Sequence, residues 1–395
     1  MLKGTGGWLT SSAQELVKRE NITLYIASVS NLVNKLTMLV GDSGINYFLI
    51  PIGHGNTDYN HEYEAYWKEI INKINPDIIH LHGTEFSHGL ACLNVCGDIK
   101  FVVTMQGVMQ EISKNYLGGL TLPRIIRNVT IYDILNGGII RNARVSKKRA
   151  EIEMEILRKV HYVIGKTDFD REQVLKINSS IKYFRCNNVL RDVFYENDKW
   201  QYSKCCPCSI FVSSSHYPLK GLHKLLEALP DVLKIYPNTR LRVAGRDMLK
   251  SDFLHQTGYE KIIGNMINKY QLRKVVSFIG KLDSEAMKKE YLNSNVFICT
   301  SSNENSSNSI SEAQILGVPI IASNVGGNPC FIVSEEDGFL YNFGDVKSLS
   351  LMICEVFDHS QFFDNSHMIH IAKERHNKKR HLEDLLNAYH MIYAE

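Results

Sequence analysis

The sequence predicts an α/β protein of two domains, each built around a largely parallel sheet. The chain has 395 residues, which is too long for one ordinary hydrophobic core and suits two domains of similar size. Val296–Thr300 and Val318–Ala322 are short apolar runs, typical of strands buried on both faces of a parallel sheet. Residues 310–316 between them have helical spacing, so this stretch is a parallel crossover.

The bulk composition is that of a soluble globular enzyme. Hydrophobic residues make up 44% and charged residues 22% of the chain. The net charge of +3 is weak and argues neither for nor against acidic ligands or an anionic membrane, and we expect no nucleic-acid partner. There is no apolar run of membrane-spanning length and no signal peptide at Met1. Nine scattered cysteines suit a reducing compartment. We therefore expect a cytoplasmic protein.

The first half of the chain alternates predicted strands and helices. The expected helices are Leu9–Lys18, Glu62–Ile74, Arg141–Lys159 and Arg171–Ile177, and the expected strands are Ile22–Ser28, Ile45–Ile52 and His161–Thr167, with a strand and turn over each of 76–83 and 101–107. Residues 196–208 are polar and irregular, as in a linker.

The second half repeats this alternation. The expected strands are Ser209–Ser214, 241–244, Val275–Gly280, the two strands of the crossover and a short strand near 339, and the expected helices are Leu222–Val232, 310–316, Val346–Phe357 and one long region His367–Tyr393. Ligands of open α/β sheets bind at the carboxyl ends of the strands, so the loop Ser301–Asn308 is the expected binding loop.

Two carboxylates frame that loop, Glu304 and Glu312. The helix that starts between them offers free backbone N–H groups and the positive end of its dipole, which suits a diphosphate. Two simpler interpretations remain open. Ser309 to Glu312 has the spacing of a capping box, and Glu304 has the character of a solvated loop acid.

The spacing of the two acids, followed by the run Gly317 to Pro329 (GVPIIASNVGGNP), resembles the nucleotide-sugar site of retaining GT-B glycosyltransferases of family 4, of the bacterial polysaccharide-assembly type. The resemblance implies the GT-B architecture, in which two Rossmann-like domains face each other across a cleft. It divides the chain into residues 1–200, which bind the acceptor, residues 201–370, which bind the nucleotide sugar, and a final helix, 371–395, that returns towards the N-terminal domain.

The resemblance also assigns roles in the second domain. Lys220, before Gly221, would neutralise the departing diphosphate, and Glu304 would contact the donor sugar, so these two are the catalytic candidates. Glu312 would bind the ribose, while the helix start at Asn308, Ser309 and Ile310 would bind phosphate. The family's arginine is replaced by Ser214, so Arg246 is a second basic candidate, and Leu282 stands where the family holds the base.

Donor contacts are also implied at the N-terminus, by Gly6 and Gly7. In the family a strand precedes this glycine pair, and Met1–Thr5 is too short to supply it. Two explanations remain open: the sequence begins late, or the sheet lacks this strand. His82, Thr84 and Glu85 are candidates for the acceptor side, together with Gln106, which replaces a family histidine and cannot take up a proton.

Two patterns raise the question of a metal. His80, His82 and His88 lack a completing Cys or Asp, so we expect no zinc site. Asp168-Phe169-Asp170 matches the manganese signature of the other large glycosyltransferase class, but Thr167 or Asp168 is more simply a helix cap. The resemblance implies no cofactor and no metal, since the nucleotide-diphosphate sugar is a substrate.

The implied function is transfer of a hexose from a nucleotide-diphosphate sugar to a saccharide or lipid-linked saccharide in bacterial surface polysaccharide synthesis. The basic region Arg141–Lys159 has two interpretations, a solvated helix face or attraction to anionic lipid at the inner membrane face. Two other functions remain open: a sugar-nucleotide epimerase or phosphorylase on the same fold, and a non-catalytic nucleotide-sugar-binding protein.

Overall fold

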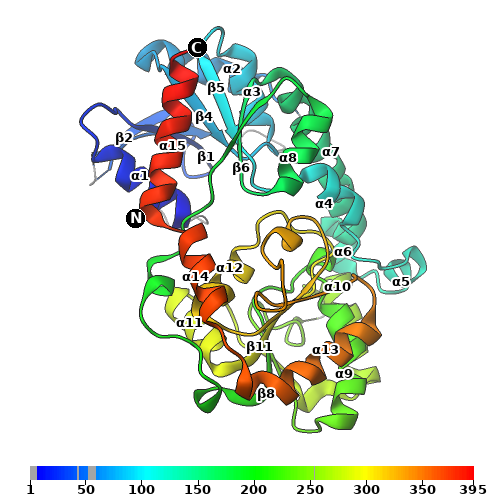
Figure 1. The fold of residues 1–395 in the computed structure, drawn as a ribbon. Helices are drawn as coiled ribbons and strands as arrows, with labels where there is room; N and C mark the ends of the chain where they lie inside the picture. Colours follow the sequence, from blue (N-terminus) through cyan, green and yellow to red (C-terminus); the bar gives the residue numbers. More distant parts are fainter. Residues whose placement is uncertain (1–6, 42–43, 52–58, 253) are drawn as a thin grey trace. The chain divides into compact units, whose positions relative to one another are not determined.

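The computed structural model describes residues 7–41, 44–51, 59–252 and 254–395. The chain forms two compact units, each α/β with parallel strands, which confirms the predicted class (Figure 1). Unit 1 comprises residues 1–110, 147–189 and 376–395, and unit 2 comprises residues 111–146 and 190–375. The expected first domain was the continuous segment 1–200. In the structure, residues 111–146 belong to unit 2, residues 147–189 return to unit 1, and the rest of unit 2 begins at residue 190.

Unit 1 holds two separate sheets among its described residues. One is parallel, in the order β4-β5-β6-β7, and the other has the order β1-β3-β2 with β2 antiparallel. Among those residues no strand pairs with both β1 and β4. The elements are α1 (Gly7–Val17), β1 (Tyr25–Ser30), β2 (Thr37–Val40), β3 (Asn46–Pro51), α2 (Glu62–Ile74), β4 (Ile78–His82), α3 (Ser87–Val95), β5 (Lys100–Thr104), α7 (Gly138–Lys159, which starts in unit 2), β6 (Tyr162–Gly165), α8 (Asp168–Ile177), β7 (Lys182–Arg185) and α15 (Lys378–Tyr393).

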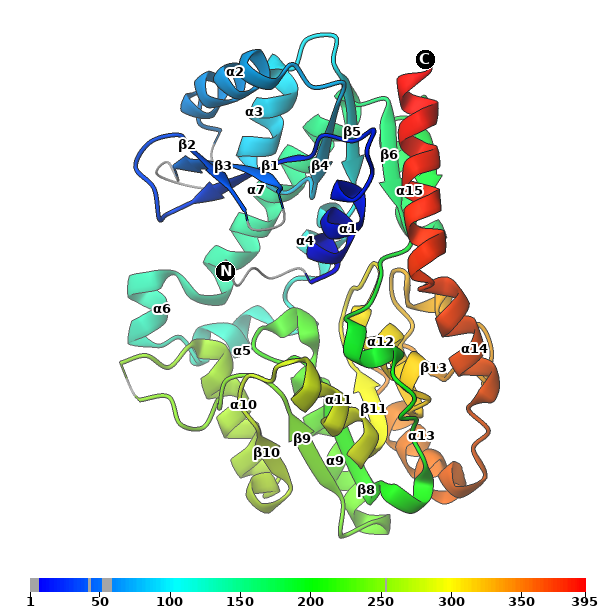
Figure 2. The same ribbon diagram turned by 90° about the vertical axis from the view of Figure 1, so that its left-hand side faces the viewer.

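Helices cover both faces of the four-stranded sheet of unit 1. Phe101 and Val103 of β5 pack with α2, α3, α7 and α8, whereas Val102 packs on the opposite face with α1 and α15. This alternation is the period of two that a strand buried on both faces must have. The C-terminal helix α15 is therefore part of the core of unit 1 (Figure 2).

Unit 2 is built on one six-stranded parallel sheet in the order β10-β9-β8-β11-β12-β13. Its strands are β8 (Cys206–Val212), β9 (Arg240–Val243), β10 (Val276–Phe278), β11 (Ser294–Cys299), β12 (Ile320–Ser323) and β13 (Phe339–Tyr341). Its helices are α4 (Met109–Asn115, which starts in unit 1), α5 (Leu122–Arg127), α6 (Ile131–Asn136), α9 (Leu222–Ile235), α10 (Gly258–Lys269), α11 (Ser284–Asn293), α12 (Asn308–Leu316), α13 (Val346–His359) and α14 (Ser366–Arg375).

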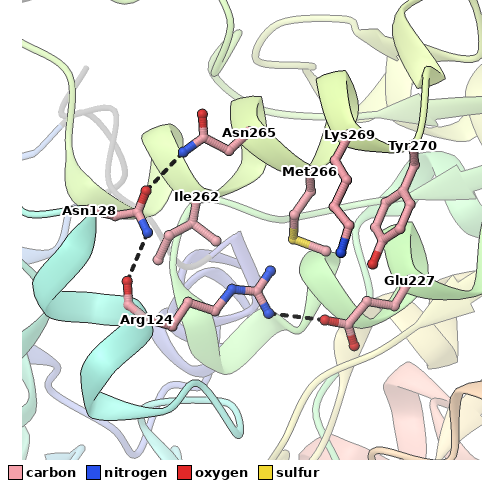
Figure 3. A pocket seen from close by; sticks show the side chains of 8 residues that line it. All are labelled: Arg124, Asn128, Glu227, Ile262, Asn265, Met266, Lys269 and Tyr270. Carbon is pink, nitrogen blue, oxygen red and sulfur yellow. Dashed lines mark hydrogen bonds and ion pairs between the residues drawn. The ribbon is translucent and has the colours of Figure 1, made fainter.

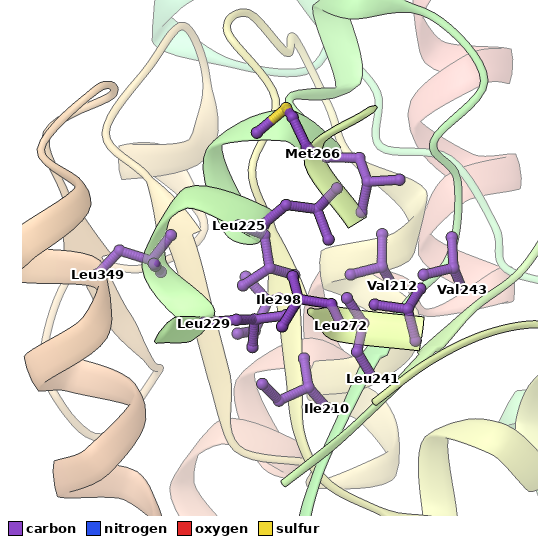
Figure 4. Packing of buried hydrophobic residues seen from close by; sticks show 14 of the residues in the cluster. Ile210, Val212, Leu225, Leu229, Leu241, Val243, Met266, Leu272, Ile298 and Leu349 are labelled. Atoms are coloured by element: carbon purple, nitrogen blue, oxygen red, sulfur yellow. The ribbon is translucent and has the colours of Figure 1, made fainter. Parts of the chain in front are cut away.

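The sheet of unit 2 is the middle of three layers (Figure 1). Ile210, Val212 and Ile298 point to the layer of α9, α10 and α13, where Leu225 and Leu229 of α9 complete the packing (Figure 4). The intervening residues of the same strands, such as Phe211 and Phe297, point to α11, α12 and α14. These two cores hold the strand ends of β8 and β11 in fixed register.

The prediction of one long helical region over His367–Tyr393 is wrong in its continuity. The chain breaks at His376 and Asn377 into α14 and α15. Asn377 caps α15 by accepting hydrogen bonds from the backbone N–H groups of Lys379 and Arg380, and His376 bonds to the carbonyl oxygen of Asn188 at 2.7 Å. A side-chain cap and a long-range contact thus outweigh the continuous apolar pattern.

Among the described residues, none of the helices combines the length and apolar character that crossing a membrane requires.

Candidate active site

Loops after β8 and β11 meet at the carboxyl edge of the sheet in unit 2. They line a small pocket that contains four of the predicted site residues, Ser214, Lys220, Glu304 and Ser309. The other lining residues are Val212, Ser213, Phe297, Ile298, Cys299, Thr300, Ser301 and Ser307. The carboxyl ends of neighbouring parallel strands share one edge, which is why residues about 90 positions apart come together here.

Lys220 and Glu304 are joined directly. The Lys220 ammonium lies 2.5 Å from Oε1 of Glu304, and the Ser301 hydroxyl donates to the same oxygen at 2.6 Å. Burial lowers the pKa of Lys220, but the Glu304 carboxylate outweighs burial, so the pKa lies above its ordinary value. The lysine is therefore a fixed positive charge, and Glu304 is not the freely solvated loop acid of the simpler interpretation.

The loop that carries Lys220 is fastened to the loop after β11. Gly221 has φ +69°, and a Cβ there would lie 1.8 Å from the carbonyl oxygen of Thr300, so only glycine fits. The Thr300 hydroxyl donates to the carbonyl oxygen of Lys220 at 2.9 Å. The Lys-Gly pair thus sets how closely the lysine approaches the 300–305 segment.

A second glycine contact holds Glu304. Gly326 has φ +54°, and a Cβ there would lie 1.9 Å from the carbonyl oxygen of Glu304. The N–H of Gly327 donates to that oxygen at 3.0 Å. The Gly-Gly pair after β12 therefore supports the backbone from which the Glu304 side chain extends.

Helix α12 begins at Asn308, as predicted, but its cap is Ser307. The Ser307 hydroxyl accepts from the N–H of Ile310 at 3.4 Å, so the capping box predicted from Ser309 to Glu312 is wrong. Ser309 instead bonds to the hydroxyl of Ser213 at 2.8 Å. This contact joins the start of α12 to the end of β8. The N–H of Ile310 is taken by the Ser307 cap, so the predicted phosphate-binding N–H groups that this cap leaves are those of Asn308 and Ser309.

Glu312 is buried and paired. Its Oε1 accepts from Nε and Nη2 of Arg191 at 3.2 and 2.8 Å, and the hydroxyl of Tyr291 is 3.5 Å from its Oε2. Burial raises the pKa of Glu312, and Arg191 opposes this rise. Sequence patterns cannot find this pair, because 121 residues separate its members.

We expect Arg191→Ala to lower the free energy of unfolding by about 2 kcal/mol, because Glu312 would be left buried without its donor. The urea midpoint of each variant measures this. In a Glu312→Gln background the same substitution should cost much less, since no buried charge remains. An unchanged midpoint for the single variant would contradict the pairing.

Four predicted donor residues lie elsewhere or cannot be placed. Arg246 is exposed, pairs with Glu260 at 3.4 Å and does not line the pocket. Leu282 packs against the core on the α12 side of the sheet. Gly6 lies outside the described residues, and Gly7 is the first residue of α1. Their proposed contacts with the donor remain predictions.

The predicted acceptor residues follow β4 and β5 in unit 1. Gly83 donates its N–H to the carbonyl oxygen of Thr104 at 3.0 Å, which holds the two strand ends together. Burial raises the pKa of Glu85 and lowers that of His82 to about 3, so this imidazole is neutral. Nε2 of Gln106 is buried and has no hydrogen-bond partner among the described residues.

The histidines show no metal geometry. His80 uses both ring nitrogens, Nδ1 with the hydroxyl of Tyr389 and Nε2 with that of Thr104, each at 2.6 Å. In the part of the chain that the structure describes, no three His, Cys, Asp or Glu residues gather in a way that could hold a metal ion. The rings of His80 and His82 are tilted by 33° with their centroids 3.9 Å apart.

The Asp-x-Asp pattern is used by the protein itself. Thr167 caps α8 by accepting from the N–H of Asp170 at 3.0 Å, as the simpler interpretation predicted. Asp170 also accepts from the hydroxyl of Tyr183, while Asp168 pairs with Arg185 at 2.9 Å.

Glu153 of α7 is a titratable group that the sequence does not point to. Its carboxylate accepts from the hydroxyl of Thr84 at 2.7 Å and lies 3.4 Å from the N–H of Gln110 at the start of α4. Burial raises the pKa of Glu153 to about 7, and the neighbouring Glu85 adds to this rise. One buried acid therefore supports both predicted acceptor loops.

We expect the stability of the protein to fall as pH rises because of Glu153. Its pKa is 4.5 ordinarily and about 7 in the folded state, so its contribution is complete below pH 4.5 and is lost as pH rises through about 7. The free energy of unfolding changes by at most about 3 kcal/mol because of this group. Thermal midpoints across this range should be flatter for Glu153→Gln, whereas Glu151→Gln, exposed on the same helix, should follow the wild type. Parallel curves for Glu153→Gln and the wild type would disprove this assignment.

A known protein family matches the larger, C-terminal part of unit 2. Residues 207–375 match the family model described as Glycosyl transferases group 1. This segment contains Lys220, Glu304, Glu312 and the α12 start, but not Arg191.

Two curated relatives are similar over shorter stretches. The sulfoquinovosyl transferase SQD2 of Arabidopsis thaliana is 29% identical over 130 residues, which are 32% of this chain and 23% of that protein. The Escherichia coli protein named UDP-Gal:alpha-D-GlcNAc-diphosphoundecaprenol alpha-1,3-galactosyltransferase is 40% identical over 65 residues, 16% of this chain and 17% of that protein. Each match spans less than a quarter of the relative's length.

Among solved structures, sucrose-phosphate synthase from Thermosynechococcus elongatus aligns with 99% of this chain and 94% of its own, with a TM-score of 0.72 and 17% identity. The likeness confirms that the chain has the fold of GT-B glycosyltransferases.

Proposed function

Since residues 207–375 form a glycosyl transferases group 1 domain, we propose that the chain transfers a hexose from a nucleotide-diphosphate sugar to a saccharide, with retention at the anomeric carbon. One observation carries this proposal: a charged lysine, an acid and a helix start converge on one pocket of unit 2. A diphosphate needs fixed positive charge and free N–H groups, and Lys220 and the start of α12 supply both.

In this scheme the diphosphate lies between Lys220 and the N–H groups at Asn308 and Ser309, and Glu312 binds the ribose. The bond from the anomeric carbon to the diphosphate breaks while an acceptor hydroxyl forms a new bond to that carbon from the same face and passes its proton to the departing diphosphate oxygen. Lys220 stabilises the charge that grows on the leaving diphosphate, and Glu304 stabilises the positive charge that grows on the sugar. Catalysis is mainly positioning and electrostatics.

We propose a uridine diphosphate sugar as donor and a lipid-linked saccharide as acceptor. The name of the Escherichia coli relative contains a UDP-sugar and a diphosphoundecaprenol saccharide, which supports both choices. On the acceptor side, Nε2 of Gln106 has no hydrogen-bond partner in the described part of the chain and is a donor suited to a sugar hydroxyl. The protein would then act in surface polysaccharide synthesis in the cytoplasm, at the inner face of the membrane.

A thermal-shift screen over uridine, guanosine and adenosine diphosphate sugars tests this function. We expect stabilisation by uridine donors, followed by transfer to a lipid-linked acceptor when both substrates are supplied. Conversion of the donor sugar to its epimer without acceptor would favour an epimerase. Donor binding without hydrolysis or transfer would favour a non-catalytic protein. Failure of every donor to stabilise the protein would refute the proposal.

We also expect a chelator to leave transfer intact, because Lys220 and α12 perform the task of a divalent cation. Transfer rates with and without EDTA measure this directly. Loss of activity that manganese restores would instead favour a metal at Asp168 and Asp170.

A further inference from the structure

Helices α5 and α6 of unit 2 expose an unusual number of large apolar side chains. Leu122 and Ile126 are one turn apart on α5 and are 56% and 62% exposed. Ile131, Ile134 and Leu135 form one face of α6, and the last two are 75% and 76% exposed. We call these five residues, together with the exposed Arg127, the α5–α6 surface.

The inner side of this hairpin is firmly attached to unit 2. Ile125 and Ile139 are buried in the core around α9 and α10. Arg124 pairs with Glu227 of α9 at 3.0 Å, and Asn128 accepts from Asn265 of α10 at 2.9 Å (Figure 3). The exposed apolar side chains are therefore presented by a fixed scaffold.

The segment itself carries mostly positive charge, while the exposed ion pair beside α6 is that of Asp252 with His255, whose ring lies 6.5 Å from that of Tyr132. Residues 121–146 contain four arginines and a single acid, Asp133. Arg127, Arg141 and Arg144 are exposed. The Asp133 carboxylate instead accepts from the N–H of Thr130 in the capping box of α6 and lies against Gly258 of α10. The outward charge is thus that of the arginines.

We propose that the α5–α6 surface docks on an anionic lipid bilayer. Exposed Ile and Leu side chains bordered by arginines match the acyl and headgroup layers of such a membrane. A second copy of the chain would bring the same positive charges together, so charge complementarity favours lipid over self-association. This inference deepens the proposed function, which places the acceptor at a membrane, and it assigns the apolar contact to α5–α6, with Arg141 at the start of the basic region Arg141–Lys159 beside the end of α6.

The test uses the full chain and vesicles of phosphatidylcholine with or without phosphatidylglycerol. In flotation, we expect binding to the anionic vesicles that weakens with salt, and little binding to phosphatidylcholine alone. The double variant Ile134→Asp/Leu135→Asp should lower the partition coefficient at least about tenfold. Arg127→Glu/Arg141→Glu should remove the preference for anionic lipid.

The matched control is Ile235→Asp/Leu351→Asp, which changes two similarly exposed side chains (61% and 58%) elsewhere on unit 2. This control should bind vesicles like the wild type, and all variants should keep the wild-type melting temperature. Wild-type vesicle binding by Ile134→Asp/Leu135→Asp, or no binding by the wild type, would overturn the proposal. So would a dimer in sedimentation that these substitutions dissociate while vesicle binding is unchanged.

This assay is independent of catalysis. Vesicle binding by a protein that binds no nucleotide sugar would leave the membrane surface standing and remove the proposed function. Donor binding without vesicle binding would leave the proposed function standing and remove the membrane surface.

Discussion

Replacing Lys220 by alanine is expected to weaken the binding of nucleoside diphosphates about 10- to 100-fold. A charge-assisted contact with phosphate contributes ~1.5–3 kcal/mol, and 1.4 kcal/mol corresponds to a factor of ten in affinity. The catalytic effect should be larger, about 10²- to 10³-fold in kcat/KM, because the charge on the diphosphate grows as the glycosidic bond breaks. Isothermal titration and initial rates measure the two effects.

The ion pair with Glu304 requires a second variant. Lys220→Ala leaves the Glu304 carboxylate without its partner, and this charge alone would repel a diphosphate. The double variant Lys220→Ala/Glu304→Gln removes the repulsion, so binding that stays weak there shows direct contact between lysine and phosphate. Full recovery in the double variant would show that the lysine acts only on Glu304. Lys234→Ala, an exposed position on α9, is the control and should bind normally.

Much of unit 2 could be predicted because its signals are local. Buried parallel strands are short apolar runs, and the glycines at 221 and 326 mark places where backbones touch. The order of strand, loop and helix then brings Lys220 and Glu304 to one sheet edge without any knowledge of their contact. Local order predicted the binding loop Ser301–Asn308, whereas the assignment of Lys220 to the same site came from the family resemblance.

The details that could not be predicted depend on residues distant in sequence. The sequence offered Ser309 as a cap for α12, but the cap is Ser307 and the hydroxyl of Ser309 is bound by Ser213. The partner of Glu312 is Arg191, on a segment outside the matched domain. Glu153 looks like any other acid on a charged helix until Thr84 is placed beside it.

Short helices were also missed. Neither α5 nor α6 is predicted, since each has only six residues and Gly137 and Gly138 directly follow α6. Helices this short are not stable by themselves, so buried anchors such as Ile125 hold them in place. Because they form only through tertiary packing, the apolar pattern of their outer faces has no meaning until the structure shows which face is covered.

Replacing Glu304 by glutamine is expected to lower kcat about 10²- to 10³-fold, because the charge that stabilises a positive anomeric centre is removed while the shape is kept. Binding should respond in the opposite direction. Lys220 would no longer be neutralised by a carboxylate 2.5 Å away, so the affinity for nucleoside diphosphates should hold or increase.

This divergence between turnover and affinity separates a catalytic Glu304 from one that only binds the sugar. A residue that binds substrate and transition state equally changes KM and leaves kcat in place. Single-turnover rates at saturating donor, together with titration of the nucleoside diphosphate, measure the two quantities independently. Glu335→Gln, an exposed acid beyond β12, should change neither. Unchanged kcat for Glu304→Gln, with donor affinity lost instead, would reduce Glu304 to a binding residue and leave Lys220 and α12 as the source of catalysis.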